Sequence, residues 1–228
     1  FPELIKLGQQ LKEQAQKLAP GIFSALDEAQ EPIPDVPNLS GIIDLPEGTQ
    51  VMPHDFQFIE LLAATPKAAQ CVAHTALIQG TQLPGDEINR ILSDSESRTE
   101  IIRRVVSCAR PRALENISFT FRLNGVSLPC ITHIVRHRMQ SVMIPALTQT
   151  DRTHKIIPPS VRQDGDCLAR YEDAFRRNAS LYQKLRGEGI SEETLIYFLL
   201  SGNTLDVVTT MNARELLLFL RLRTCNRA

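Results

Sequence analysis

The run IVRHRMQS at residues 134–141 decides how this chain is interpreted, together with the run MNAREL at residues 211–216. Both runs place arginines in segments that otherwise consist largely of apolar residues, so they predict arginines in buried surroundings. A cation in an apolar setting is costly unless an anion or a hydrogen-bond partner offsets it. The two runs therefore indicate phosphate recognition, in a nucleotide or flavin site.

The composition is that of an ordinary globular chain, with 228 residues, 43% hydrophobic residues and a formal net charge of -1. No apolar run reaches the roughly 18 residues that span a bilayer, and no basic segment followed by an apolar stretch opens the chain. We therefore expect a cytoplasmic protein with no membrane partner. The five cysteines show no CxxC spacing, so we expect them to be reduced and mostly structural.

Charge is distributed unevenly along the chain. Acidic residues are in excess over residues 1–109, and basic residues are in excess over residues 110–228. A basic half in a nearly neutral chain fits a small anionic ligand in a cleft better than a nucleic-acid track. Self-association of the unlike surfaces explains the asymmetry about as well.

The first 53 residues differ from the rest. Leucines at helical spacing up to Pro20 predict an amphipathic helix, and the prolines between residues 31 and 53 predict an extended arm. The remaining residues, 54–228, are expected to form one main domain. Its periodic patterns predict strands at 57–62 and 116–123, helices over 65–78, 86–108 and 168–185, and a break near residues 93–97.

The segment that leads into the first run has its own signals. Asn124-Gly125 predicts a turn, and Ser127 predicts the N-cap of a helix that tolerates Pro129 in its first turn. Cys130 is expected on the apolar face of this helix, as a packed core residue and not as a thiolate. The helix would present Arg136–Arg138 at its C-terminal end, where cations are favoured.

The second run predicts the start of the last helix. Asn212 followed three residues later by Glu215 is typical of an N-cap with its capping-box partner. The backbone N–H groups at such a helix start attract anions. At about 100° per residue, Arg214 and Arg221 share one face of the helix, whereas Arg223 projects from the opposite side.

Four blocks in the same order resemble the flavin-dependent thymidylate synthases, whose central signature is Arg-His-Arg followed by a serine, an asparagine, a second serine and an arginine. The resemblance covers roughly residues 56–228. Its blocks are FIELLAATP (58–66), LENISFTF (114–121), RHRMQS (136–141) and the ending from Met211 to Ala228.

The resemblance implies an α/β domain of the α+β type, with a central, mainly antiparallel sheet flanked by helices, which forms a homotetramer that binds FAD between subunits. Carried over by position, the flavin-binding residues are Glu115, Arg136, His137, Arg138, Asn212 and Arg214. Arg223 would bind the pyrimidine and be catalytic, because an arginine near a uracil carbonyl stabilises the anion that makes carbon 5 nucleophilic. In the family, methylenetetrahydrofolate supplies the carbon and NADPH regenerates the reduced flavin.

The second half of the signature departs from the family pattern. Aligned without a gap, its substituted positions are Met143, Ile144, Ala146 and Thr148, which would empty the nucleotide phosphate site. A four-residue insertion instead aligns Thr150-Asp151-Arg152 with the serine-x-arginine, and we prefer it over Arg152 as a surface charge. Further departures are His133, Leu128 and Ile196. The substrate-binding residues that follow from this alignment are His133, Ser141, Thr150, Arg152 and Arg223.

His133 and His137 are expected one turn apart on the same helix, a spacing that can bind a metal. No carboxylate lies close in sequence, so we expect no metal and assign both residues to the nucleotide or flavin pocket. Three functions stay open. They are an FAD-dependent methyltransferase acting on dUMP or a related uridine nucleotide, a flavin-binding paralogue that no longer makes dTMP, and a phosphate-recognising module. The 5% of aromatic residues and the lack of Trp argue against nucleic-acid binding.

Overall fold

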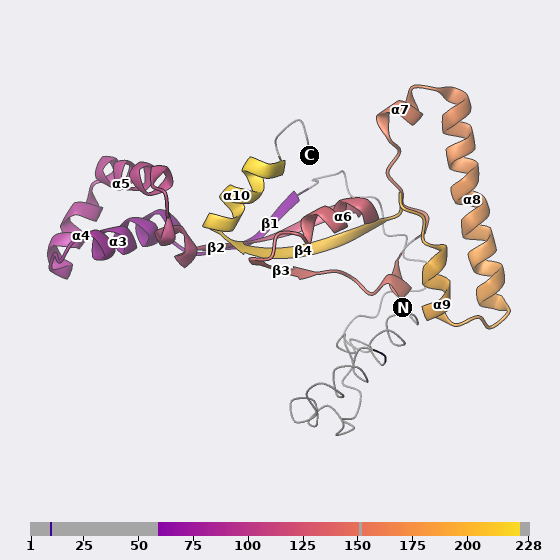
Figure 1. The fold of residues 1–228 in the computed structure, drawn as a ribbon, viewed down its shortest axis with the longest axis horizontal. Coiled ribbons are helices and arrows are strands. Elements are labelled where there is room, and N and C mark those ends of the chain that lie inside the picture. Colours follow the sequence, from indigo (N-terminus) through magenta and orange to yellow (C-terminus); the bar gives the residue numbers. More distant parts are fainter. Residues whose placement is uncertain (1–9, 11–58, 151, 224–228) are drawn as a thin grey trace, which may run out of the picture. The chain divides into compact units, whose positions relative to one another are not determined.

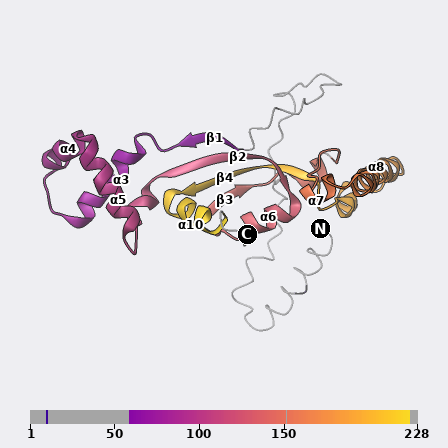
Figure 2. The ribbon, with the colours of Figure 1, turned by 90° about the horizontal axis from the view of Figure 1, so that it is seen from above.

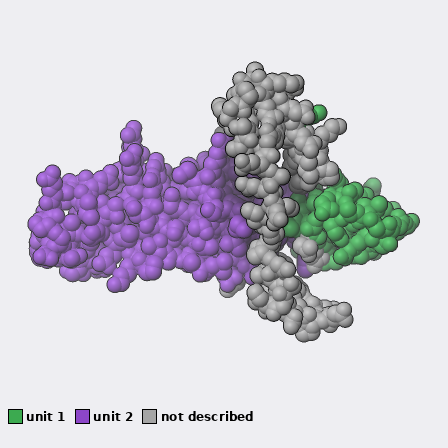
Figure 3. All heavy atoms as spheres, turned by 90° about the horizontal axis from the view of Figure 1, so that it is seen from below, with its two compact units in different colours: residues 1–54, 146–153, 157–203 green, residues 55–145, 154–156, 204–228 purple. Residues whose placement is uncertain are grey.

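The computed structural model describes Gln10, residues 59–150 and residues 152–223, without the side chain of Gln149. The predicted N-terminal helix and proline-rich arm at 1–53 lie outside these residues, as do Asp151 and the last five residues. The chain divides into two compact units (Figure 3). Among the described residues, the sheet unit comprises residues 59–145, 154–156 and 204–223, and the helical unit includes residues 146–150, 152–153 and 157–203.

Within the described residues, a four-stranded antiparallel sheet has the order β1-β2-β4-β3 (Figure 1). Its strands are β1 (Ile59–Ala64), β2 (Ser118–Ser127), β3 (Gln140–Met143) and β4 (Thr204–Asn212). Every second residue of β4 is buried, from Leu205 to Met211, which is the period of a strand with one covered face. The predicted α+β fold with a mainly antiparallel sheet is confirmed.

The pairing of β4 brings distant segments together at one end of the sheet. Ser118 pairs with Asn212 across β2 and β4, and Gln140 pairs with Met211 across β3 and β4. The runs at residues 134–141 and 211–216 are therefore direct neighbours in the fold, although about seventy residues separate them in the chain.

Six helical segments accompany the sheet in this unit. They are α3 (Ala68–Gly80), α4 (Gly85–Ser93), α5 (Ser95–Ser107), the 3-10 helix η2 (Arg112–Asn116), α6 (Leu128–Ile134) and α10 (Ala213–Arg223). The predicted break falls at Asp94, whose carboxylate accepts a hydrogen bond of 2.7 Å from the Ser97 amide and caps α5. Helices α3 to α5 lie beyond one end of the sheet, and α6 and α10 lie beside its strands (Figure 1, Figure 2).

An apolar cluster connects α10 to the rest of the unit. Val72, Ala113, Leu114 and Ile117 are buried together, and Leu217 of α10 is among the partly buried residues packed against them. The α10 backbone is also held by a hydrogen bond of 3.0 Å from the Ala213 amide to the Ile117 carbonyl. The last helix is therefore fixed against η2, the segment that carries Glu115.

The predicted turn at Asn124-Gly125 is wrong, because β2 continues through both residues. Gly125 has φ of +67°, and the pairing with β4 shifts register between Leu123 and Val126. Such a bulge needs a residue that tolerates positive φ and a partner for the displaced amide. Asp206 provides the partner, since its carboxylate accepts from the Gly125 amide at 2.9 Å. It also accepts from Arg122 at 2.6 Å, which raises the pKa of Arg122.

Ser127 caps α6 as predicted, because its hydroxyl accepts a hydrogen bond from the Cys130 amide at 3.4 Å. The prediction that Cys130 is a packed core residue is wrong, since its side chain is exposed. The helix buries Ile131 and Ile134, three positions apart, and Cys130 lies about 100° from Ile131 around the axis. Two further cysteines, Cys108 and Cys167, are exposed as well.

The helical unit contains the 3-10 helices η3 (Leu147–Gln149) and η4 (Ile196–Phe198) and the helices α7 (Pro159–Arg162), α8 (Gly165–Gly187) and α9 (Glu192–Leu195). Asp164 caps α8, and Gly189, with φ of +81°, follows its C-terminus. Phe175, Tyr182 and Leu195 are buried in this unit. None of the helices in the described residues has the length and apolar character of a membrane span.

Candidate functional site

The site is built where β4 ends and α10 begins. The Asn212 side chain accepts a hydrogen bond of 2.9 Å from the Glu215 amide, so the predicted N-cap is confirmed. This bond satisfies one of the amides that every helix start leaves without an intrahelical partner. The positive end of the helix dipole makes this point attractive to anions.

A hollow of about 330 Å³ lies next to this helix start. It is lined by Ser118, Arg138, Met139, Gln140, Ser141, Thr210, Met211 and Asn212. Three residues predicted from the sequence, Arg138, Ser141 and Asn212, therefore border the same hollow, although they come from three segments. A guanidinium and a helix N-terminus facing one open hollow suit an anionic ligand.

Gln140 fixes the segment that carries the arginines. Its amide nitrogen donates to the Ile134 carbonyl at 2.6 Å, and its amide oxygen accepts from the Thr209 hydroxyl at 2.8 Å. One side chain thus connects the end of α6 to the central strand β4. Because Ile134 and Gln140 flank the loop over residues 135–139, these contacts close the loop and attach it to β4.

His137 is the buried member of the first run, with 6% of its surface exposed. Its Nδ1 lies 2.9 Å from an oxygen of Glu215, which is 7% exposed. The Phe219 ring packs against the imidazole, with a centroid separation of 4.7 Å and an interplanar angle of 51°. Glu215 and Phe219 both come from α10, so the histidine joins the two runs in the core of the unit.

Arg223 completes this group from the end of α10. Its Nε donates to His137 Nε2 at 3.1 Å, and its Nη2 donates to the His133 carbonyl at 3.0 Å. A guanidinium carries five N–H donors. The two contacts fix the plane of the Arg223 guanidinium and use two of its donors.

Glu115 and Arg214 form an ion pair across η2 and α10, and each side chain is 44% exposed. The structure therefore brings these two predicted flavin-binding residues together at the surface. An exposed pair of this kind contributes only about 0–1 kcal/mol to stability, so its side chains can be recruited to a ligand at little cost.

The prediction that the two runs bury their arginines is wrong. Arg136, Arg138 and Arg214 are exposed, whereas His137 is buried. The expected common helix of His133 and His137 is also wrong, because α6 ends at Ile134. The guanidinium groups extend into solvent from a loop and from a helix start, and they stay hydrated there. The apolar residues next to them in the sequence therefore do not bury them.

The helical unit holds Arg152, which is only 6% exposed. Its Nη2 donates to the Leu195 carbonyl at 2.8 Å, and its guanidinium carbon lies 3.9 Å from the centroid of the Tyr182 ring. Among the described residues, Nε and Nη1 of Arg152 have no hydrogen-bond partner, and the same holds for the buried hydroxyl of Thr150. The alternative of Arg152 as a surface loop charge is wrong.

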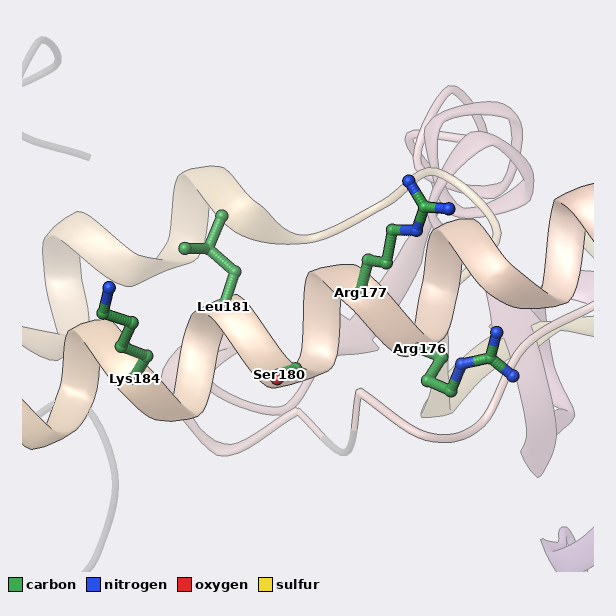
Figure 4. Close-up of a pocket in the computed structure, with 5 residues that line it drawn as sticks. All are labelled: Arg176, Arg177, Ser180, Leu181 and Lys184. Carbon is green, nitrogen blue, oxygen red and sulfur yellow. The ribbon is translucent and has the colours of Figure 1, made fainter.

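A second basic surface, along α8, is formed by Arg176, Arg177, Ser180, Leu181 and Lys184 (Figure 4). Both arginines form ion pairs with Asp173, and their hydrogen bonds lower the pKa of that carboxyl. The side chains of both arginines are at least 75% exposed. This is the solvated face of a helix and not a binding site.

Comparison with known proteins decides the family. The model of the thymidylate synthase complementing protein family matches residues 60–228. The chain belongs to this family. A flavin-dependent thymidylate synthase of Geobacter sulfurreducens is 30% identical over 174 residues, 75% of this chain and 75% of its own length. The flavin-dependent thymidylate synthase of Sulfolobus acidocaldarius is 30% identical over 176 residues, which are 75% of this chain and 66% of that protein.

Solved structures with the same fold include thymidylate synthase X from Helicobacter pylori, with FAD and dUMP, at a TM-score of 0.53 and 19% identity, over 75% of this chain and 85% of that one. The UMP/dUMP methylase PolB from Streptomyces cacaoi, bound with 5-Br dUMP, has a TM-score of 0.58 and 21% identity over 74% of this chain and 78% of that one. By family, the chain is a thymidylate synthase-like methyltransferase.

Sequence interpretation missed three residues of this flavin-dependent thymidylate synthase-like site. Gln140 and Phe219 were passed over, and Glu215 was assigned to a capping box. The Glu215 carboxylate instead bonds His137, 78 residues away in sequence. One sequence signal pointed to this role. Glu215 directly precedes the apolar run at residues 216–220, so its carboxylate is expected to need a buried partner. No group of three metal-ligating side chains occurs in the part of the chain that the structure describes.

Gln140→Leu tests the connection between α6 and β4. The substitution removes the donor to Ile134 and the acceptor for Thr209, so we expect the free energy of unfolding in urea to fall by about 1–3 kcal/mol. Gln140→Glu keeps the acceptor for Thr209 but places a carboxylate oxygen against the Ile134 carbonyl, so it should be at least as destabilising as Gln140→Leu. Gln79→Leu, at an exposed position of α3, is the matched control with an expected change within about 0.5 kcal/mol. A Gln140→Leu protein as stable as this control would contradict the role of Gln140.

Proposed function

We propose that this protein is an FAD-dependent methyltransferase that converts dUMP, or a related uridine nucleotide, into its 5-methyl form. Methylenetetrahydrofolate would supply the carbon and NADPH the electrons. The observation that carries this proposal is the convergence of Arg138, Ser141 and the Asn212-capped helix on one hollow. Family membership and the FAD and dUMP held by the related Helicobacter pylori protein support the same assignment.

The residues that would hold FAD fit its chemistry. A pyrophosphate is an anion, and the sheet unit offers it exposed guanidinium groups beside a helix N-terminus. The proposed cofactor-binding residues are Glu115, Arg136, His137, Arg138, Asn212 and Arg214. Bound there and reduced by NADPH, the flavin would pass on the two electrons that convert the transferred carbon to a methyl group. The residues of the chain orient it and keep the ligand charges paired.

Arg223 is the residue proposed to act on the pyrimidine. Its guanidinium is held at two donors by His137 and the His133 carbonyl, so its orientation is defined before any ligand binds. A further N–H group can then donate to a uracil carbonyl oxygen. A donor at that oxygen stabilises negative charge as it develops, which increases the nucleophilicity of carbon 5. Ser141 and His133 are proposed to contact the same substrate.

Thr150 and Arg152 are proposed to bind the nucleotide phosphate. The buried Arg152 guanidinium, whose Nε and Nη1 have no partner among the described residues, needs an acceptor, because a buried cation is costly unless hydrogen bonds offset its desolvation. A phosphate offers oxygens in a geometry that matches the guanidinium. This arrangement supports the four-residue insertion in the signature.

A flavin-binding paralogue that no longer makes dTMP is the second candidate. One observation favours it: Met143 and Ile144, which replace polar positions of the family signature, are exposed and apolar, at 68% and 38%. Side chains of this kind would not hold a nucleotide phosphate. The paralogue would keep the flavin residues of the sheet unit and bind a different partner beside them.

The assay that separates these candidates uses purified protein reconstituted with FAD. We expect flavin absorbance to remain with the protein after gel filtration, and dTMP to form from dUMP, methylenetetrahydrofolate and NADPH. Titration with dUMP, UMP and dTMP, followed by the flavin spectrum, ranks the nucleotides. Retained flavin without dTMP formation would select the paralogue. Protein that binds no flavin would contradict both candidates.

Arg152→Met tests the phosphate assignment. We expect the affinity for dUMP to fall about 10- to 100-fold, because one charge-assisted hydrogen bond contributes about 1.5–3 kcal/mol, while affinity for deoxyuridine stays unchanged. Arg152→Lys keeps the charge and should recover part of the loss, and circular dichroism checks folding. Arg162→Met, at an exposed position of the same unit, is the control. Equal losses for dUMP and deoxyuridine would show that Arg152 only supports the fold.

Self-association as a homotetramer with FAD between subunits is part of the proposal. The sheet unit exposes large apolar side chains, including Met139 and Met143 at 68% each and Leu218, Leu220 and Leu222 of α10. Extended apolar exposure is unusual for a monomer and typical of a subunit interface. Light scattering should therefore give about four times the chain mass of 25.5 kDa. A monomer at micromolar concentration would contradict this assembly.

A further inference from the structure

Glu215 is a buried carboxylate that the family resemblance does not assign to any ligand. It lies in the first turn of α10, where the helix dipole favours a negative charge, and its amide is hydrogen-bonded to Asn212. Its carboxylate contacts His137 at 2.9 Å. The Phe219 ring covers the imidazole. A charged group kept in this place needs a role that offsets its desolvation.

The contacts of His137 determine which ring nitrogen carries the proton. The Arg223 guanidinium can only donate, so His137 Nε2 must accept at their 3.1 Å contact. The proton of the ring is then on Nδ1, which faces the carboxylate of Glu215, an acceptor. Carboxylate, imidazole and guanidinium thus form a chain of hydrogen bonds with a single consistent direction.

The opposite tautomer would disrupt this chain. With the proton on Nε2, two N–H groups would face each other at the contact with Arg223, and Nδ1 would face a carboxylate without a proton between them. The acceptor at Glu215 therefore decides whether His137 can accept from Arg223. In metal sites, a carboxylate that orients a ligating histidine affects metal affinity or activity about 10- to 100-fold, and we expect an effect of the same order on the orientation of Arg223.

We propose that Glu215 is a positioning residue: it fixes His137 in the Nδ1–H tautomer, so that Nε2 holds the Arg223 guanidinium in its orientation for the nucleotide base. The proposal rests on the proposed function, in which Arg223 binds the pyrimidine. Glu215 itself touches no substrate. Its effect passes through one imidazole ring to the arginine at the other end of α10.

The test compares Glu215→Gln with Glu215→Met. Gln offers an amide oxygen to Nδ1–H and should keep the tautomer, whereas Met offers no comparable acceptor at similar volume. Nitrogen-15 NMR of histidine-labelled protein reports the tautomer of His137, identified by comparison with His137→Gln. We expect the Nδ1–H form in the wild type and in Glu215→Gln, and loss of this form in Glu215→Met. The affinity of flavin-loaded Glu215→Met for dUMP should fall about 10- to 100-fold. The affinity of Glu215→Gln should stay within about threefold of wild type, because the amide oxygen still accepts from Nδ1–H.

Leu217→Ala is the matched control, because it loosens the packing of α10 against the cluster at Leu114 and leaves the His137 contacts in place. It should lower stability without changing the tautomer. An unchanged Nδ1–H signal in Glu215→Met, or an equal loss of dUMP affinity in the Gln and Met variants, would overturn the role of Glu215. If wild-type protein binds no uridine nucleotide, the proposed function fails, and the tautomer comparison still decides the inference.

Discussion

The hydrogen bond between the Asn212 side chain and the Glu215 amide fixes the point at which the central strand becomes the last helix. Moving this point by one residue would rotate α10 by about 100°. Glu215 would then no longer face His137, and Arg223, eight residues farther on, would lose its two contacts at the other end of the helix. The hollow beside Asn212 depends on the same junction, since residues of β4 form one of its walls. A single cap therefore sets the geometry of a site whose residues come from four segments.

The site combines a hydrogen-bonded set of three side chains, two of them buried, with several exposed charges. His137, Glu215 and Arg223 are already paired with one another, so this part is preorganised and costs little to order when a ligand binds. Arg138 and the Glu115–Arg214 pair are solvated, and they can turn toward an anion without first losing a buried partner. A preorganised centre suits the proposed orientation of the base, and exposed cations suit the proposed binding of a phosphate or pyrophosphate.

The local elements of this fold follow from short-range signals. The break near residues 93–97, Ser127 as a cap, the period of α8 and the Asn212 helix start could be predicted from the sequence. Each depends on neighbours within about four residues. The errors arose where a distant residue decides. Asn124-Gly125 forms a bulge instead of a turn because Asp206, on another strand, accepts from the Gly125 amide. The Glu215 carboxylate bonds His137 across the core and does not complete the expected capping box. The sequence pattern also could not tell that the guanidinium groups of the first run reach solvent while the histidine between two of them is buried.

The two units support the proposed function on different physical grounds. In the sheet unit, His137, Glu215 and Arg223 are joined by hydrogen bonds within the chain, and Arg138, Ser141 and Asn212 border one hollow, so the geometry identifies a candidate site. In the helical unit, Arg152 is identified by what it lacks among the described residues, namely acceptors for Nε and Nη1. The Tyr182 ring and the Leu195 carbonyl offset only part of the desolvation of its charge. Replacing a wholly structural arginine by an apolar side chain would destabilise the unit, because the Leu195 carbonyl would lose its donor, but it would not distinguish dUMP from deoxyuridine. A buried guanidinium whose Nε and Nη1 have no acceptor among the described residues therefore supports the proposal of an anionic ligand at this position.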